Sequence, residues 1–253
     1  MMTRLSDFIE AGPIISLPFA ENWDALINTP LFLITLTLLA YQCGLSIYKI
    51  SGNFSLLHPL LISSMVMVVS IHALKIRYED YFVKTNMLYF LLGPTTVALA
   101  VPMHQYFFQI RKFALPILVT LIVGSTSAFA SALLIAKYFG ANETVIFSLA
   151  PKSVTTPIAL NIVQIIGGSP SLTAGVVVAT GIIGAIVAPF IFKLLKIDDP
   201  KVQGFTLGLT AHAVGTAKAF DISGEAGAFA SLALSLTGIF TVFLLPFVIH
   251  FFV

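Results

Sequence analysis

Long apolar stretches, separated by short polar connections, run through most of this sequence. A helix needs about 20 consecutive apolar residues to cross the hydrocarbon core of a bilayer. The stretches that meet this requirement without interruption are residues 30–48, 56–74, 113–136, 171–192 and 227–250. The pattern therefore predicts an all-α, polytopic integral membrane protein. The composition agrees, because only 9% of the residues are charged, against about 25% in a soluble domain.

Three further stretches are apolar but contain Pro, Gly or polar side chains, namely 87–104, 144–165 and 204–219. If each of them crosses, the chain has about eight transmembrane helices and both termini lie on one side. If one of them is re-entrant, it returns to the side from which it started, and this count changes. Non-helical backbone at membrane depth is tolerated only inside protein or beside a water-filled cavity. We therefore expect a functional site at such interrupted stretches.

The basic residues predict an orientation for the arrangement with eight crossings. One side then holds Arg4, Lys75, Arg77, Lys84, Lys137, Lys193, Lys196 and Lys201. The other side holds Lys49, Arg111 and Lys112. Because cytoplasmic loops are enriched in Lys and Arg, this division predicts that both termini are cytoplasmic.

A repeat of about 57 residues is visible in the second half of the chain. The sequence TGIIGAIVAPF begins at Thr180, and TGIFTVFLLPF begins 57 residues later at Thr237. Gly124 and Gly181 are related by the same offset. The offset predicts three units, each an interrupted segment followed by a regular span, which start near residues 94, 151 and 208. Such repeats are typical of transporters with discontinuous helices, although membrane helices are rich in Gly and Pro in any case.

The stretch APKSVTTPIAL, residues 150–160, places a charge and two prolines in apolar surroundings. Pro151 and Pro157 each remove an N–H donor and disfavour helix in the preceding residue, so the backbone between them is expected to be unwound. A helix that resumes near Pro157 would direct free N–H groups at this gap, and helix N-termini attract anions. The residues that add a positive charge or a hydroxyl donor are Lys152, Ser153, Thr155 and Thr156. We interpret this stretch as half of a binding site for a small anion.

The stretch TAHAVGTAKAF, residues 210–220, is expected to supply the other half. It offers Thr210, His212, Thr216 and Lys218, with Gly215 as the flexible point. An ionisable residue inside a membrane is a functional-site candidate, because leaving it in lipid costs several kcal/mol. Neither stretch contains Asp or Glu, so their cationic donors favour an anionic ligand. The alternative is that Lys152 or Lys218 extends to the membrane interface.

Two residues are candidates for carrying a coupled proton. His212 is one, because histidine titrates near neutral pH. Glu225, which follows the second stretch, is the other. The alternatives for Glu225 are a salt bridge with Lys218 and a solvated loop carboxylate.

Several other observations limit the classes of function. The formal net charge of +2 gives no support to a nucleic-acid partner, and the single cysteine, Cys43, excludes a disulfide within the chain. We find no catalytic motif and no cluster with metal-ligand spacing, so we expect no enzyme activity, no metal and no cofactor. Residues 1–27 are expected to be an N-terminal extension that lies partly in the membrane interface. Residues 28–253 are expected to form a single transmembrane domain.

Four stretches together resemble the LrgB/CidB family of bacterial membrane proteins: SLAPKSVTTPIA, SLTAGVVVATGIIGAIVAPF, GLTAHAVGTAKAF and EAGAFASLALSLTGI. FLLGPTTVALAVP fits the same pattern, and the resemblance runs from about residue 30 to the end. Bacterial members are described as regulators of murein hydrolase activity that act with a small, holin-like LrgA/CidA-type membrane protein. The plant chloroplast relative is a glycolate/glycerate transporter, and some bacterial members are linked to pyruvate or related acids.

The resemblance implies a location in the bacterial inner or plasma membrane and leaves two functions open. The first is a carrier of small monocarboxylates, such as glycolate, glycerate, lactate or pyruvate. The second is a holin/antiholin-associated regulator of murein hydrolase activity. For either function we expect contact with the lipid bilayer, an LrgA/CidA-type partner and a homo-oligomer, with a dimer favoured.

Overall fold

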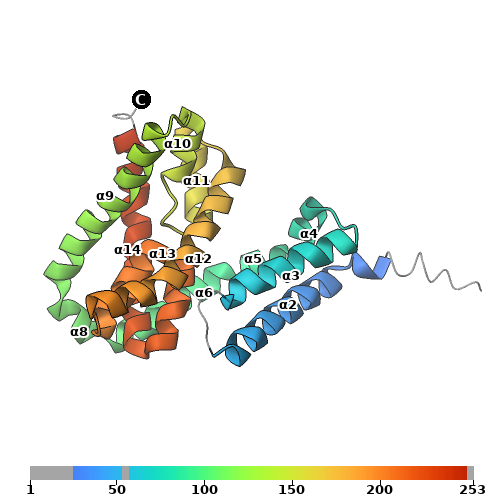
Figure 1. Cartoon of the computed structure of the whole chain (residues 1–253), viewed down its shortest axis with the longest axis horizontal. Coiled ribbons are helices and arrows are strands. Elements are labelled where there is room, and N and C mark those ends of the chain that lie inside the picture. Colours follow the sequence, from blue (N-terminus) through green and yellow to red (C-terminus); the bar gives the residue numbers. More distant parts are fainter. Residues whose placement is uncertain (1–24, 53–56, 250–253) are drawn as a thin grey trace, which may run out of the picture.

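The computed structural model describes residues 25–52 and 57–249, and in these residues every regular element is a helix (Figure 1). The helices are α2 (Pro30–Ile50), α3 (Pro59–Ala73), α4 (Tyr78–Lys84), α5 (Asn86–Phe90), α6 (Leu92–Ala98), α7 (Ala100–Gln105), α8 (Phe107–Lys112), α9 (Ala114–Tyr138), α10 (Glu143–Leu149), α11 (Thr156–Ile166), α12 (Pro170–Leu195), α13 (Pro200–Ile222) and α14 (Gly224–Ile249). Most of the N-terminal extension that we expect at residues 1–27 lies outside the described residues.

The helices confirm an all-α, polytopic membrane protein. Within the described ranges, five segments are long and apolar enough to cross a bilayer: Pro30–Ile50, Asn86–Gln105, Ala114–Tyr138, Pro170–Leu195 and Gly224–Pro246. A sixth candidate is the pair α3 and α4, which is bent by 115°. The two remaining predicted segments, 144–165 and 204–219, each contain a break in the helix.

Helix α13 is a helical hairpin rather than a crossing. The backbone leaves helical geometry at Ala211 and reverses at His212, where φ is 42° and ψ is −130°. The second half then packs back on the first, with Gly215 against the carbonyl oxygen of Leu207. Consequently the segment ends where it began, and Lys201 Nζ lies 3.6 Å from Glu225 Oε1.

Helices α10 and α11, joined by the non-helical residues 150–155, form another hairpin. It is the first hairpin in the chain, and the α13 hairpin is the second. The chain beyond α11 returns to the end of α10, where the Ser169 N–H donates to Ser148 Oγ at 2.7 Å. Helix α12 starts beside the same point, because Thr173 Oγ1 donates to the Ser148 carbonyl oxygen at 3.0 Å. Segment 144–165 therefore also folds back instead of crossing.

The two hairpins enter the helix bundle from opposite ends. The α10–α11 hairpin packs on the C-terminal halves of α9 and α14, in a cluster that includes Leu133, Ile146 and Leu245. The α13 hairpin packs on the N-terminal ends of the same two helices, where Phe205 and Phe229 share a cluster. In Figure 1, α10 lies near the C-terminal end of α14, and α8 lies at the other end of the bundle.

This arrangement overturns the predicted division of the basic residues. The prediction grouped Lys137 with Lys193, Lys196 and Lys201. In the structure Lys201 Nζ lies 5.7 Å from the ring centre of Phe113. Phe113 directly follows Arg111 and Lys112 in the chain, so Lys201 lies at the same end of the bundle as these two residues. Lys137 lies at the far end of α9. The prediction fails because it requires 144–165 and 204–219 to cross, and its charge imbalance therefore gives no orientation.

Small residues allow the close packing of the α13 hairpin. Gly204 lies against the carbonyl group of Ala226, and Gly208 lies against that of Ala230. A side chain at either glycine would collide with the backbone of α14. The pair of glycines four residues apart therefore identifies a helix contact, as it does in other membrane proteins.

The hairpins also give the predicted repeat a physical form. The predicted units near 151 and 208 each correspond to one hairpin and one crossing helix. Such a unit contains an odd number of crossings, so the second of these two units is inverted relative to the first. The glycines at the 57-residue offset each face a hairpin: Gly124 faces Leu209, Gly181 faces His212, and Gly238 faces Ile158. The repeat itself remains a prediction, since these contacts describe packing and not ancestry.

Candidate functional site

The linker between α10 and α11, residues 150–155, forms the tip of the first hairpin. Pro151 and Val154 are buried, whereas Lys152 and Ser153 are half-buried. The Lys152 ammonium lies 3.5 Å from Ser153 Oγ. Helix α11 resumes at Thr156, as predicted from the two prolines. The tip therefore presents a lysine and hydroxyl groups on unwound backbone.

Thr155 occupies the N-cap position of α11, and its side chain makes no capping hydrogen bond. Thr156, the first residue of the helix, is half-buried like its neighbour. Because a capping side chain normally accepts from the first-turn N–H groups, these N–H groups are left for another acceptor. Both threonines thus lie where the sequence places them, at the start of the resumed helix.

The tip of the second hairpin is formed by Ala211 and His212. The His212 ring is buried, and its Nε2 lies 2.9 Å from the carbonyl oxygen of Val177 in α12. Because a carbonyl oxygen only accepts, Nε2 carries the proton in this contact. Thr216 Oγ1 donates to the His212 carbonyl oxygen at 2.9 Å, and Thr210 Oγ1 donates to that of Thr206 at 2.7 Å.

Gly215 is not the flexible point that the sequence suggests. It has no positive φ, and it lies within the second arm of the hairpin. The reversal occurs at His212 instead, which is one of three non-glycine residues with positive φ among those described. The missing side chain of Gly215 has a packing role, because it admits the Leu207 carbonyl group to the hairpin interior.

The tips of the two hairpins meet on α12. The side chain of Val177 packs in a buried cluster with Val154 and Ala159 of the first hairpin. The backbone carbonyl group of Val177 holds His212 of the second hairpin. The two stretches singled out in the sequence, which are separated by about 60 residues, therefore share one contact point inside the bundle.

Lys218 belongs to a different place from Lys152. Its ammonium donates to the Tyr48 hydroxyl at 2.6 Å and forms an ion pair with Asp221 at 3.5 Å. These groups line a cavity of about 610 Å³ between the α2–α3 pair and the second arm of α13, together with Lys49 and His58. The structure therefore separates the two lysines that the sequence assigns to one site.

Sequence reasoning missed Tyr48 and His58 as neighbours of Lys218. They lie at the end of α2 and at the N-cap of α3, where such residues read as membrane-interface side chains. Only the folded arrangement brings them to α13, across 170 and 160 residues of chain. Nothing in the sequence of α2 or α3 indicates this contact, because both helices have the composition of ordinary membrane spans.

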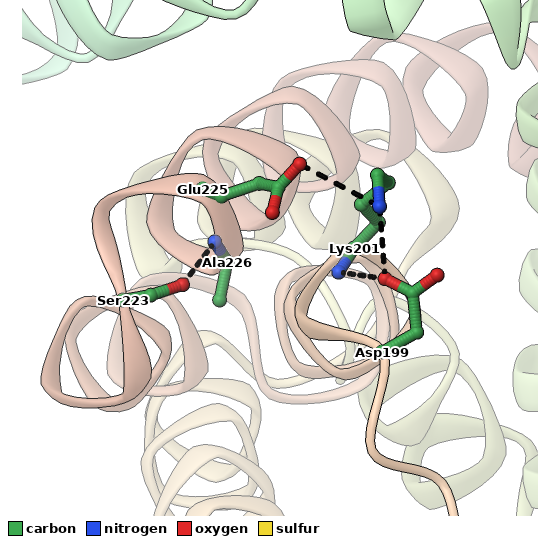
Figure 2. Close-up of polar contacts among 5 residues, drawn as sticks. All are labelled: Asp199, Lys201, Ser223, Glu225 and Ala226. Carbon is green, nitrogen blue, oxygen red and sulfur yellow. Dashed lines mark hydrogen bonds and ion pairs between the residues drawn. The ribbon is translucent and has the colours of Figure 1, made fainter.

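Glu225 pairs with Lys201, and not with Lys218 as one alternative proposed (Figure 2). Lys201 Nζ also lies 3.2 Å from Asp199 Oδ1, and this hydrogen bond raises the pKa of the Lys201 ammonium. Ser223 Oγ accepts from the Ala226 N–H at 3.0 Å. These contacts fasten the base of the α13 hairpin to the start of α14, so Glu225 has a structural partner already.

The pair predicts a double-mutant result. Lys201→Glu and Glu225→Lys are each expected to lower the free energy of unfolding by about 1 kcal/mol or less, because the pair is partly exposed to solvent. The double reversal should recover most of this loss. Thermal unfolding of the purified variants in detergent provides the measurement. If the loss of unfolding free energy in the double variant equalled the sum of the two single losses, the pair would contribute nothing to stability.

The fold and the two hairpins define a multi-pass α-helical membrane protein. Residues 37–251 match the LrgB-like family. The chain therefore belongs to the LrgB family.

Relatives of known name cover nearly the same region. YwbG of Bacillus subtilis strain 168, described as an uncharacterized protein, is 37% identical over 218 residues, which is 85% of this chain and 96% of YwbG. YxaC of the same strain, with the same description, is 34% identical over 88% of this chain and 96% of YxaC. Antiholin-like protein LrgB of Bacillus cereus strain B4264 is 31% identical over 86% of this chain and 95% of that relative. No solved structure matches this chain.

Proposed function

We propose that this protein is a carrier of small monocarboxylates of the glycolate, glycerate, lactate and pyruvate class. The observation that supports this function best is the meeting of two re-entrant hairpins, which enter from opposite ends of the bundle. Discontinuous helices that meet inside the membrane form the substrate sites of many secondary transporters. In such a bundle, a site between the two hairpin tips can open first to one end of the bundle and then to the other, as alternating access requires.

The chemistry at the first hairpin favours an anion. Lys152 carries a positive charge at the tip, and among the described residues no ion pair joins it to a carboxylate. The unwound linker adds the Ser153 hydroxyl, and the start of α11 adds uncapped N–H groups. A substrate carboxylate would supply the acceptor that these donors lack. The substrate class itself comes from the family resemblance.

In this carrier we assign Lys218 the role of attracting the anion, separate from the binding role of Lys152. The cavity at Lys218, between α2, α3 and α13, has room for a small acid. The cavity is lined by the ammonium groups of Lys49 and Lys218 and by one carboxylate, that of Asp221, so its net charge is positive. An anion approaching the bundle would be attracted to these charges. His212 remains the candidate for a coupled proton, because it joins the second hairpin to α12.

A second function is favoured by the names of the relatives. Several relatives at 31% identity are called antiholin-like protein LrgB, which supports regulation of murein hydrolase activity more directly than it supports transport. In this function the protein acts with an LrgA/CidA-type partner, as a homo-oligomer. Many large apolar side chains on α9 and α12 are exposed, including Leu115, Ile183 and Phe190, and they are available to lipid or to such partners. The two functions are compatible if acid flux produces the cell-wall effect.

Uptake of labelled glycolate, lactate and pyruvate into liposomes tests the proposal. The liposomes contain the purified full chain, either alone or with an LrgA-type protein. Saturable uptake under either condition supports the carrier. The absence of uptake under both conditions, with correctly inserted protein, would leave the antiholin-like function as the better description.

A further inference from the structure

A small buried hole lies behind the tip of the first hairpin. Its volume is about 10 Å³, and its lining includes Ser153 of the linker, Ser125 of α9, and Thr237 and Thr241 of α14. A space of this size admits one water-sized group. The hole therefore has room for a single oxygen atom, surrounded by hydroxyl groups from three parts of the chain.

Two of these hydroxyl groups are buried without a partner. In the part of the chain that the structure describes, Ser125 Oγ and Thr237 Oγ1 make no hydrogen bond, and the two residues are only 4% and 2% exposed. A buried polar group that lacks a partner destabilises the fold. Other hydroxyls on α9, such as those of Thr126 and Ser127, bond to their own helix backbone. Among the described residues, Ser125 Oγ and Thr237 Oγ1 are the buried side-chain atoms without a partner, and both residues line the hole.

The surroundings of the hole indicate the charge of its ligand. Ser153 Oγ lines the hole and lies 3.5 Å from the Lys152 ammonium. Among the residues that the structure describes, no Asp or Glu lines the hole. A metal cation would meet the lysine charge without a compensating carboxylate, whereas an anionic oxygen would meet an ammonium group and several hydroxyl donors. Ser125 and Thr237 also lie about halfway along α9 and α14, at the depth where transporters of this construction hold substrate.

We infer that Ser125 and Thr237 are substrate-binding residues that donate hydrogen bonds to one carboxylate oxygen, while Lys152 neutralises the same carboxylate. This inference rests on the proposed carrier function and extends it, because it draws the two continuous helices α9 and α14 into the site. The hydroxyls remain unpaired in the protein alone because their partner is the substrate. The cost of leaving them unpaired is recovered when the acid binds.

The double variant Ser125→Ala/Thr237→Val tests this inference. Binding of lactate to the purified full chain is measured from the rise in Tm with lactate concentration, at constant ionic strength. We expect the variant to bind lactate at least about tenfold more weakly for each hydroxyl removed, since hydrogen bonds to charged groups are strong. In buffer without acid its Tm should equal or exceed that of the parent protein. The neutral amide of lactate should raise the Tm of neither protein.

The matched control is Thr126→Val/Ser127→Ala, which removes two exposed hydroxyls from the same part of α9. It should bind lactate as the parent protein does. Unchanged lactate binding in the Ser125→Ala/Thr237→Val variant, while the parent protein binds, would overturn this inference and leave the carrier function standing. A lower Tm of that variant without acid would overturn it too, by showing that the hydroxyls serve stability. If the parent protein neither binds nor transports acids, the carrier function fails and this inference fails with it.

Discussion

Replacement of Lys152 by alanine is expected to reduce uptake of monocarboxylates to the background of empty liposomes. The ammonium group is the one full positive charge at the tip of the first hairpin, and its only described polar contact is Ser153 Oγ at 3.5 Å. Removing it would leave the carboxylate with hydroxyl donors alone, in surroundings where an uncompensated charge costs several kcal/mol. A loss of at least about 100-fold in kcat/KM follows from a penalty of that size.

Two variants separate the charge of Lys152 from its effect on folding. Lys152→Arg keeps the charge and should retain measurable uptake with a raised KM. Lys137→Ala removes an exposed lysine at the end of α9 and should transport normally. Uptake by Lys152→Ala at the parental rate, with equal amounts of inserted protein, would remove Lys152 from the site.

Replacement of Gly208 by leucine is expected to abolish the folded protein. A side chain at this position meets the carbonyl group of Ala230, which belongs to the backbone of α14 and has no room to move. The first arm of the α13 hairpin would have to separate from α14, in the contact that buries Leu207, Ala226 and Ala230. We expect a loss of about 3 kcal/mol or more, measured as the yield and Tm of monodisperse protein after extraction in detergent.

Gly175→Leu provides the matched control for this substitution. It makes the same exchange within α12, where, apart from the neighbouring backbone of α12 itself, no described atom lies within 4 Å of the position that a Cβ atom would take. The variant should fold with a Tm equal to or above that of the parent protein, because leucine favours helix more than glycine by up to about 1 kcal/mol. Similar behaviour of the two variants would mean that α13 and α14 do not pack as described.

The sequence predicts the apolar helices and the break between α10 and α11, because these depend on local chemistry. Apolar runs determine which segments belong in a membrane, and Pro151 and Pro157 determine where α10 ends and α11 begins. Family membership follows from short motifs, so the sequence predicts it as well.

The sequence does not predict whether the chain continues across the membrane or turns back after each break. An interrupted apolar segment has the same composition whether it crosses or returns. The difference lies in a local reversal of the backbone, at residues 150–155 in the first hairpin and at His212 in the second. Treating 144–165 as a crossing placed Lys193, Lys196 and Lys201 at the wrong end of the bundle. The grouping of Lys218 with Tyr48, and of Ser153 with Ser125 and Thr237, depends on helix packing between segments far apart in sequence.

The central claim is that the hairpins enter from opposite faces of the membrane. Single cysteines at the exposed positions Glu143, Asp198 and Ile222, introduced after Cys43→Ser, test it directly with a membrane-impermeant thiol reagent on sealed vesicles. The predicted result is that the cysteines at 198 and 222 are labelled from one face and the cysteine at 143 from the other. Labelling of 198 and 222 from opposite faces would show that the intervening segment crosses the membrane, and would contradict the opposed hairpins on which the proposed carrier depends.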